Sequence, residues 1–83
     1  MANLEKYKNA FCEAFQIEDS KLIGLSYQAI PTWDSVGHMS LVAALEQEFD
    51  IMMETDDIID LSSFEKGIEI LSKNYEIAFN SQI

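Results

Sequence analysis

Apolar residues recur at three- and four-residue steps near the start of the chain, which is the spacing of one face of an α-helix. The pattern predicts a helix over residues 2–15. Its core face comprises Leu4, Tyr7, Phe11, Ala14 and Phe15. Residues 16–33 lose this period and carry Gly24 and Pro31, so we expect a long loop there, held down by its own side chains and including a short turn of helix. The apolar anchors of this loop are Leu22, Ile23, Leu25 and Ile30.

The second predicted helix runs from about Ser35 to Phe49, and the Asp34 carboxylate suits its N-cap position. Its core face, read at about 100° per residue, comprises His38, Leu41, Val42, Leu45 and Phe49. A second apolar face comprises Val36, Met39 and Ala43, with Glu46 beside them. A helix in so small a bundle needs only one apolar face, so we interpret the second as a contact site for partners. The alternative is that the long loop or a neighbouring helix covers it.

A short helix of one or two turns is expected over residues 55–60. Thr55 suits its N-cap position, because a threonine hydroxyl can accept a hydrogen bond from a free amide of the first turn. Asp56 and Asp57 follow in that first turn, where the helix dipole favours negative charge. The pattern therefore predicts a short acidic helix between the two longer ones.

The last predicted helix opens with Ser62 and Glu65, which have the three-residue spacing of a capping box. Its core face comprises Phe64, Ile68, Leu71 and Tyr75. We expect this helix to fray near Phe79, leaving residues 80–83 as a frayed tail.

No stretch shows sustained period-two alternation, so no sheet is predicted. The sequence predicts an all-α fold, a small four-helix bundle of three main helices and one short helix with a long first loop. A length of 83 residues, 48% of them hydrophobic, suits a single domain over residues 1–83. Because a chain this short buries only about 60–65% of its unfolded surface, we expect a modest core and marginal stability.

The formal net charge is −10, from 15 Asp and Glu residues against 5 Lys and no Arg. This charge argues against binding to nucleic acid, whose phosphates it would repel, and to anionic membrane surfaces. From Leu22 to Glu65, with Glu65 included, the chain has nine carboxylates and no Lys. We interpret this stretch as a docking surface for partners with basic patches, with general solubility as the alternative. The carboxylates assigned to docking are Glu46, Glu48, Asp56 and Asp57.

Cys12 is the single cysteine, so an intramolecular disulfide is excluded. It falls within the first predicted helix and is interpreted as a small core or edge residue. No signal-peptide pattern precedes it, and no apolar run is long enough to span a bilayer. We therefore expect a cytoplasmic monomer with no membrane insertion.

Three enzyme readings fit the sequence poorly. Ser35 and His38 are three residues apart on one helix and could touch, but His38 falls on the core face, where its imidazole would be packed. A glycoside hydrolase needs two carboxylates across a cleft, which an acidic strip does not provide. No dedicated metal site is expected, because the acidic residues lack calcium-loop spacing and the glycine of that loop, and only diffuse cation binding is plausible. Those acidic residues are Asp50, Glu54, Asp56, Asp57 and Asp60.

Ser35 is the residue most open to a chemical role. A serine near a helix start is most often a cap or first-turn residue with no further function. However, a helix N-terminus offers free amides and a positive dipole end, so a phosphodiester on Ser35 would be stabilised there. The hydroxyl also lies beside the second apolar face and the acidic stretch, so a group attached to it would be presented to a docking partner.

The sequence from Trp33 to Met39, Trp-Asp-Ser-Val-Gly-His-Met, resembles the Asp-Ser-Leu attachment motif of acyl carrier proteins in its Trp-Asp-Ser-Leu-Gly-His form. Residues 45–51 resemble the acidic end of the same helix in that family. The resemblance extends over the whole chain in length, acidity, helix order, long first loop and final helix. It implies a four-helix carrier domain.

The resemblance implies that Ser35 is esterified by 4′-phosphopantetheine, so that the chain becomes a phosphoprotein. A separate phosphopantetheinyl transferase would install the group from coenzyme A with Mg²⁺, and Asp34 would assist at the site of that transferase. The thiol of the arm would hold an acyl or aminoacyl group as a thioester for loading and transfer enzymes. On this reading the chain is not itself an enzyme, because the chemistry belongs to the arm and to the partners.

The chain departs from the family pattern at three positions. Val36 replaces the usual Leu, and Gly37 and Ser40 stand where many carriers of fatty-acid synthesis have carboxylates. The start of the recognition helix is therefore less acidic, which favours a dedicated biosynthetic pathway, such as polyketide, peptide-type or polysaccharide- or lipid-linked acyl transfer, over bulk fatty-acid synthesis. The alternative reading is an interaction domain with a carrier-like fold and no prosthetic group.

Overall fold

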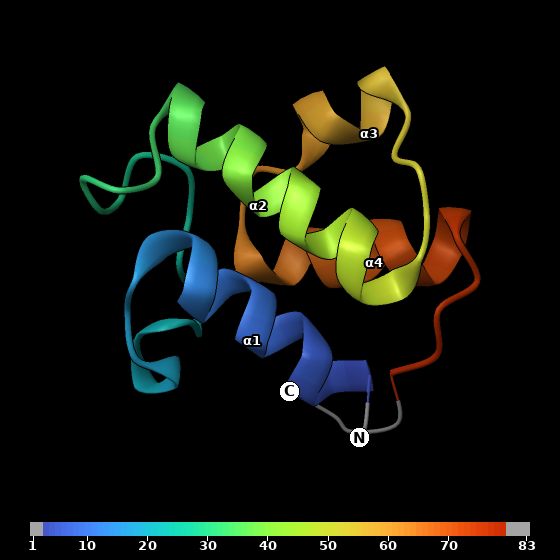
Figure 1. The fold of residues 1–83 in the computed structure, drawn as a ribbon, viewed down its shortest axis with the longest axis horizontal. Coiled ribbons are helices and arrows are strands. Elements are labelled where there is room, and N and C mark those ends of the chain that lie inside the picture. The colour runs from blue at the N-terminus through green and yellow to red at the C-terminus, as the bar shows by residue number, and fades with distance from the viewer. Residues whose placement is uncertain (1–2, 80–83) are drawn as a thin grey trace.

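The structure, a computed structural model, describes residues 3–79 of the chain. Its elements in order are α1 (Asn3–Phe15), the 3₁₀ turn η1 (Asp19–Lys21), α2 (Ser35–Phe49), α3 (Thr55–Asp60) and α4 (Phe64–Asn74) (Figure 1). The predicted all-α fold of three main helices and one short helix is confirmed. Within residues 3–79 there is no strand, only an isolated antiparallel bridge between Ser26 and Ser63. Residue 2, predicted to begin the first helix, and the predicted tail at 80–83 lie outside the described residues.

An aromatic cluster forms the centre of the core, because α1, α4 and the long loop each contribute buried rings. Phe11 of α1 contacts four other rings at centroid distances between 4.9 and 5.7 Å, namely Tyr7, Phe15, Trp33 and Phe64. Such pairs each contribute about 0.5–1.5 kcal/mol beyond the area that they bury. Because Trp33 is fully buried in this cluster, the end of the loop is fixed in place just before α2 begins.

The core faces of α1 and α2 follow the predicted period, with differences at their edges. In α1, Ala10 is buried, three residues after Tyr7 and on the same face, whereas the predicted Ala14 is half-buried. In α2, His38 and Phe49 lie near the two ends of the core stripe and are half-buried. The buried residues of α2 are Leu41, Val42 and Leu45.

The face that α4 buries differs from the prediction because of one close contact with α1. The hydroxyl of Tyr7 donates a 2.6 Å hydrogen bond to the carbonyl of Phe64. A Cβ on Gly67 would lie 2.0 Å from that hydroxyl oxygen, so only glycine leaves room for the contact. Gly67 is therefore buried against α1, while the predicted core residues Ile68 and Tyr75 are half-buried.

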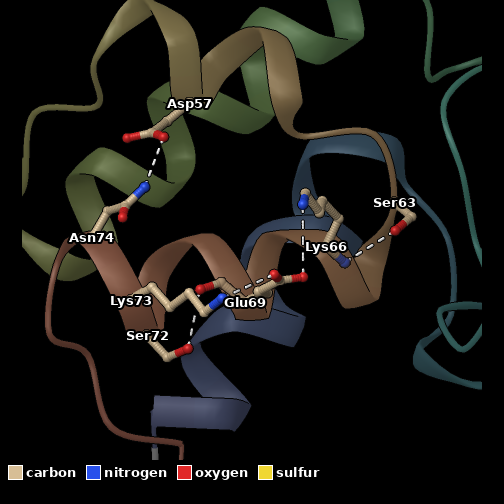
Figure 2. Close-up of polar contacts among 7 residues, drawn as sticks. All are labelled: Asp57, Ser63, Lys66, Glu69, Ser72, Lys73 and Asn74. Carbon is tan, nitrogen blue, oxygen red and sulfur yellow. Dashed lines mark hydrogen bonds and ion pairs between the residues drawn. The ribbon is translucent and has the colours of Figure 1, made fainter.

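Two predicted helix caps are wrong by one residue. Thr55 is the first residue of α3 and does not cap it; Glu54 takes the N-cap position without a side-chain hydrogen bond. Ser63, not Ser62, caps α4, and its Oγ accepts a 3.0 Å bond from the amide of Lys66 (Figure 2). The segment before α4 is extended and pairs with the long loop, so the helix begins one residue later than predicted.

Hydrogen bonds tie the long loop to the start of α4. Glu65, predicted to complete a capping box, instead accepts a 2.9 Å bond from the amide of Gly24. The amide of Phe64 donates to the carbonyl of Leu25 at 2.9 Å. The expected turn of helix is present as η1. Of the four predicted anchors, Leu22 and Leu25 are buried and Ile30 is half-buried against the core, but Ile23 is 62% exposed, so that anchor was wrong.

Candidate functional site

Ser35 is the first residue of α2, and its side chain is exposed to solvent. Two neighbours fix its position. Trp33 is buried in the aromatic cluster, and Asp34, in extended geometry, carries the chain from there into the helix. The hydroxyl is therefore held at the N-terminus of α2 by a buried indole two residues before it.

The N-cap predicted at Asp34 is confirmed. Its Oδ1 accepts a 2.8 Å hydrogen bond from the amide of Gly37, and its carbonyl accepts from the amide of His38 at 2.8 Å. The amides of Ser35 and Val36 have no acceptor within residues 3–79, as is usual in a first helical turn. A phosphate ester on Ser35 would thus meet free N–H groups and the positive end of the helix dipole.

His38 bridges two elements with its two ring nitrogens. The indole Nε1 of Trp33 can only donate, and it lies 3.0 Å from His38 Nδ1, so Nδ1 is the acceptor. The proton of the neutral ring is then on Nε2, which donates to the carbonyl of Ile58 in α3 at 2.7 Å. Neither nitrogen is left to take a proton from Ser35. The imidazole is half-buried and stacks on the indole of Trp33, so His38 lies at the edge of the predicted core face.

A pocket of about 340 Å³ opens beside Ser35, between the long loop, the start of α2 and α3. We call it the α2–α3 pocket. Its walls are mostly apolar and contain no carboxylate or ammonium group. Its volume is at the lower end of the roughly 300–1,000 Å³ of small-molecule sites. The lining residues are Tyr27, Ser35, His38, Met39, Ile58, Ile59, Leu61 and Ser62.

The sequence did not identify most of this pocket. Tyr27 and Ser62 reach it because the long loop pairs with the segment before α4, which is a contact between distant parts of the chain. For Ile59, the sequence contained a signal of an exposed apolar contact that the prediction did not use. Ile59 is an apolar residue within an acidic helix, and it is 71% exposed at the rim of the pocket.

The second apolar face of α2 is open to solvent. Val36 is 76% exposed and Met39 is 53% exposed, and Ala43 is also exposed. No helix or loop among residues 3–79 covers these residues, so that alternative was wrong. Of this face, Met39 lines the α2–α3 pocket beside Ser35, as does the exposed Ile59 of α3.

The four carboxylates assigned to docking fall into two pairs. Glu48 and Asp56 are exposed, as docking requires. Glu46 is half-buried, and its Oε2 accepts a 2.9 Å bond from the amide of Met53, which stabilises the turn after α2. Asp57 is half-buried and ties α3 to the end of α4. It accepts hydrogen bonds from Asn74 and Tyr75.

The link at Asp57 depends on two uncharged donors. Its Oδ1 accepts from Asn74 Nδ2 at 2.9 Å (Figure 2), and its Oδ2 accepts from the hydroxyl of Tyr75 at 2.7 Å. The same hydroxyl accepts a 2.8 Å bond from the amide of Glu54. Burial is the largest cause that raises the pKa of the Tyr75 phenol; the bond from the Glu54 amide opposes it and the Asp57 carboxylate adds to it, so the pKa is raised and the hydroxyl stays a donor.

The acidic stretch on α2 and α3 has no lysine partner within residues 3–79. Both ion pairs described there lie within α4, from Lys66 and Lys73 to Glu69, at 3.7 and 3.4 Å (Figure 2). Both are exposed and contribute little to stability. The field of the α2 and α3 carboxylates is therefore not neutralised locally and can attract a basic partner.

Other kinds of site were also considered. Among residues 3–79, no three His, Cys, Asp or Glu side chains lie together as a metal site would require. No helix of the described chain has the length and apolar character to cross a membrane. Comparisons with protein-family models, with curated proteins and with solved structures found no match. The candidate site therefore rests on the motif at Ser35 and on the geometry around it.

Proposed function

We propose that this protein is an acyl carrier protein, with 4′-phosphopantetheine esterified to Ser35 and acyl or aminoacyl intermediates carried on it. The observation that supports this most directly is the exposed Ser35 hydroxyl at the open N-terminus of α2, next to an apolar pocket. A buried hydroxyl could not reach the site of a transferase. An exposed serine without an anion-stabilising helix end would be a poorer place for a phosphodiester.

The roles of the residues follow from their positions. Ser35 Oγ would form the bond to phosphorus as the diphosphate of coenzyme A is cleaved, losing its proton while the nucleotide part leaves. The amides of Ser35 and Val36 would then face the phosphate oxygens. Asp34 would hold the helix start in place and assist at the site of the transferase. When bound, the group would supply the thiol that holds the cargo as a thioester.

The exposed apolar surface suits the enzymes that load and unload the carrier. Val36, Met39 and Ala43 would contact those enzymes, while Glu48 and Asp56 would attract their basic patches. The uncharged start of α2, with Gly37 and no carboxylate after Asp34 in the first turn, supports a dedicated biosynthetic pathway rather than bulk fatty-acid synthesis. A reducing, cytoplasmic setting is part of the proposal.

The test is the intact mass of the purified chain after incubation with coenzyme A, Mg²⁺ and a broad-specificity phosphopantetheinyl transferase. We expect a gain of one phosphopantetheine per chain. Ser35→Ala should abolish the gain without loss of helical circular dichroism. Ser40→Ala, an exposed serine on the same helix, is the matched control and should still be modified. No gain on the wild-type chain would refute the proposal.

One observation favours a second candidate function. The exposed apolar face of α2 and the carboxylates of α2 and α3, which form no ion pair within residues 3–79, make an interaction surface that does not depend on Ser35. An interaction domain with a carrier-like fold and no prosthetic group would use the same surface. It would show no mass gain with the transferase, yet it would bind a basic partner equally well as wild type and as Ser35→Ala.

A further inference from the structure

α3 is held in place by a few polar contacts and by Ile58, which is half-buried and packs against the core. The helix has six residues, and none of them is buried. Helices this short are marginal by themselves, so contacts with other elements must hold it in place. At its first turn, Asp57 is bound by Asn74 and Tyr75 of the α4 end.

At the other end of α3, the contact is His38. The carbonyl of Ile58 is one of the last four carbonyls of the helix, which have no partner within a helix of this length. His38 Nε2 donates to it at 2.7 Å, and this is the only hydrogen bond between α2 and α3 within residues 3–79. The other ring nitrogen is held by the fully buried Trp33, so the imidazole is itself fixed.

We propose that His38 is a positioning residue that holds α3 beside Ser35 and so sets the width of the α2–α3 pocket. The pocket has His38 and Met39 on one wall and Ile58 and Ile59 on the other, so the bond from His38 to Ile58 joins the two walls directly. Without it, α3 keeps the bonds of Asp57 and of the Glu54 amide to the end of α4 and the packing of Ile58, but it has no hydrogen bond to α2 within residues 3–79 and can move away from that helix. Any effect of the pocket width on a group bound to Ser35 rests on the proposed function, whereas the positioning of α3 by His38 does not.

Three substitutions separate the two hydrogen bonds of His38. His38→Asn places an amide oxygen near the position of Nδ1, so it can accept from Trp33 but cannot reach Ile58. His38→Gln places an amide nitrogen near the position of Nε2, so it can still donate to Ile58. His38→Phe keeps a ring and loses both bonds. Met39→Leu, on the same wall of the pocket and without a hydrogen bond there, is the matched control.

The decisive measurement is amide hydrogen exchange on the unmodified protein, read at Ile58 and Leu61 of the α3 region and at Phe11 of α1. In His38→Phe and His38→Asn we expect exchange at Ile58 and Leu61 to rise about threefold to tenfold, as loss of one hydrogen bond predicts, with little change at Phe11. His38→Gln and Met39→Leu should stay near wild type. Equal acceleration at all three sites, or none in His38→Phe, would overturn the proposal.

A second measurement tests whether the hydrogen bond from His38 to Ile58 affects a group bound at Ser35. On protein modified at Ser35 and loaded with a short acyl group, the thioester should react with hydroxylamine faster in His38→Phe and His38→Asn than in His38→Gln. A rate that is the same in all three variants would refute control of the pocket by His38. Absence of modification would refute the proposed function alone, and the exchange experiment would still decide whether His38 positions α3.

Discussion

The carbonyl oxygen of Thr32 lies only 1.8 Å from the place that a Cβ on Gly37 would occupy. Glycine at this position therefore lets the end of the long loop lie directly against the first turn of α2. The close approach fixes the path of Trp33, Asp34 and Ser35 into the helix, with the indole buried and the hydroxyl exposed.

This contact predicts the sign of a helix substitution. Glycine to alanine within a helix normally stabilises it by up to about 1 kcal/mol. For Gly37→Ala we expect the opposite, a loss of about 1–3 kcal/mol in the free energy of unfolding, because the new methyl group must displace backbone atoms of Thr32. Ser40→Ala in the same helix should be neutral or slightly stabilising. Urea denaturation of both variants is the measurement. A stabilised Gly37→Ala would contradict the prediction and show that Thr32 can shift to make room for the methyl group.

Asp34 has two proposed roles that two substitutions can separate. Asp34→Ala removes the acceptor for the Gly37 amide and should cost about 1 kcal/mol of stability. Asp34→Asn keeps an acceptor at the N-cap and removes only the charge, so it should stay close to wild type in stability. If Asp34 assists the transferase by its charge, both variants should be modified more slowly at Ser35. Normal modification of Asp34→Asn would leave Asp34 as a cap alone.

The buried Tyr7 predicts a loss of stability at alkaline pH. Burial first, and then the nearby Glu65, raise the pKa of its phenol well above the ordinary value of about 10. Above that ordinary value the unfolded chain releases the proton while the folded chain keeps it, so the free energy of unfolding should fall as pH rises past 10. Tyr7→Phe should be about 1 kcal/mol less stable near neutral pH and depend less on alkaline pH. Equal pH profiles would contradict this account.

Local chemistry explains what the sequence predicted correctly. The cap at Asp34 and the exposed face of Val36 and Met39 depend only on residues within one or two helical turns. Position on a helix circumference can be calculated from spacing, and cap preference is a property of the residue type. The start of α2 and the exposure of Ser35 could therefore be predicted from the sequence alone.

Contacts between distant segments explain what the sequence did not predict. Glu65 has the correct spacing for a capping box with Ser62, but its carboxylate binds the amide of Gly24 in the long loop. In the same way, the sequence indicated that Asp57 is an exposed surface charge, but the fold places Tyr75 at the end of α4 beside it, and the two side chains form a hydrogen bond. The α2–α3 pocket belongs to this group, because its walls come from three segments that are separate in the sequence.

Electrostatic steering of a basic partner is best tested at Glu48 and Asp56, the two exposed carboxylates of the four assigned to docking. Glu48→Gln with Asp56→Asn should slow association with a transferase that has a basic docking patch by about twofold to fivefold at low salt, and less at high salt, because screening weakens steering. Stability should hardly change, since both side chains are exposed. Glu13→Gln, exposed on α1, is the control for net charge and should have a smaller effect. Stopped-flow rates over a salt series are the measurement, and salt-independent rates would contradict steering.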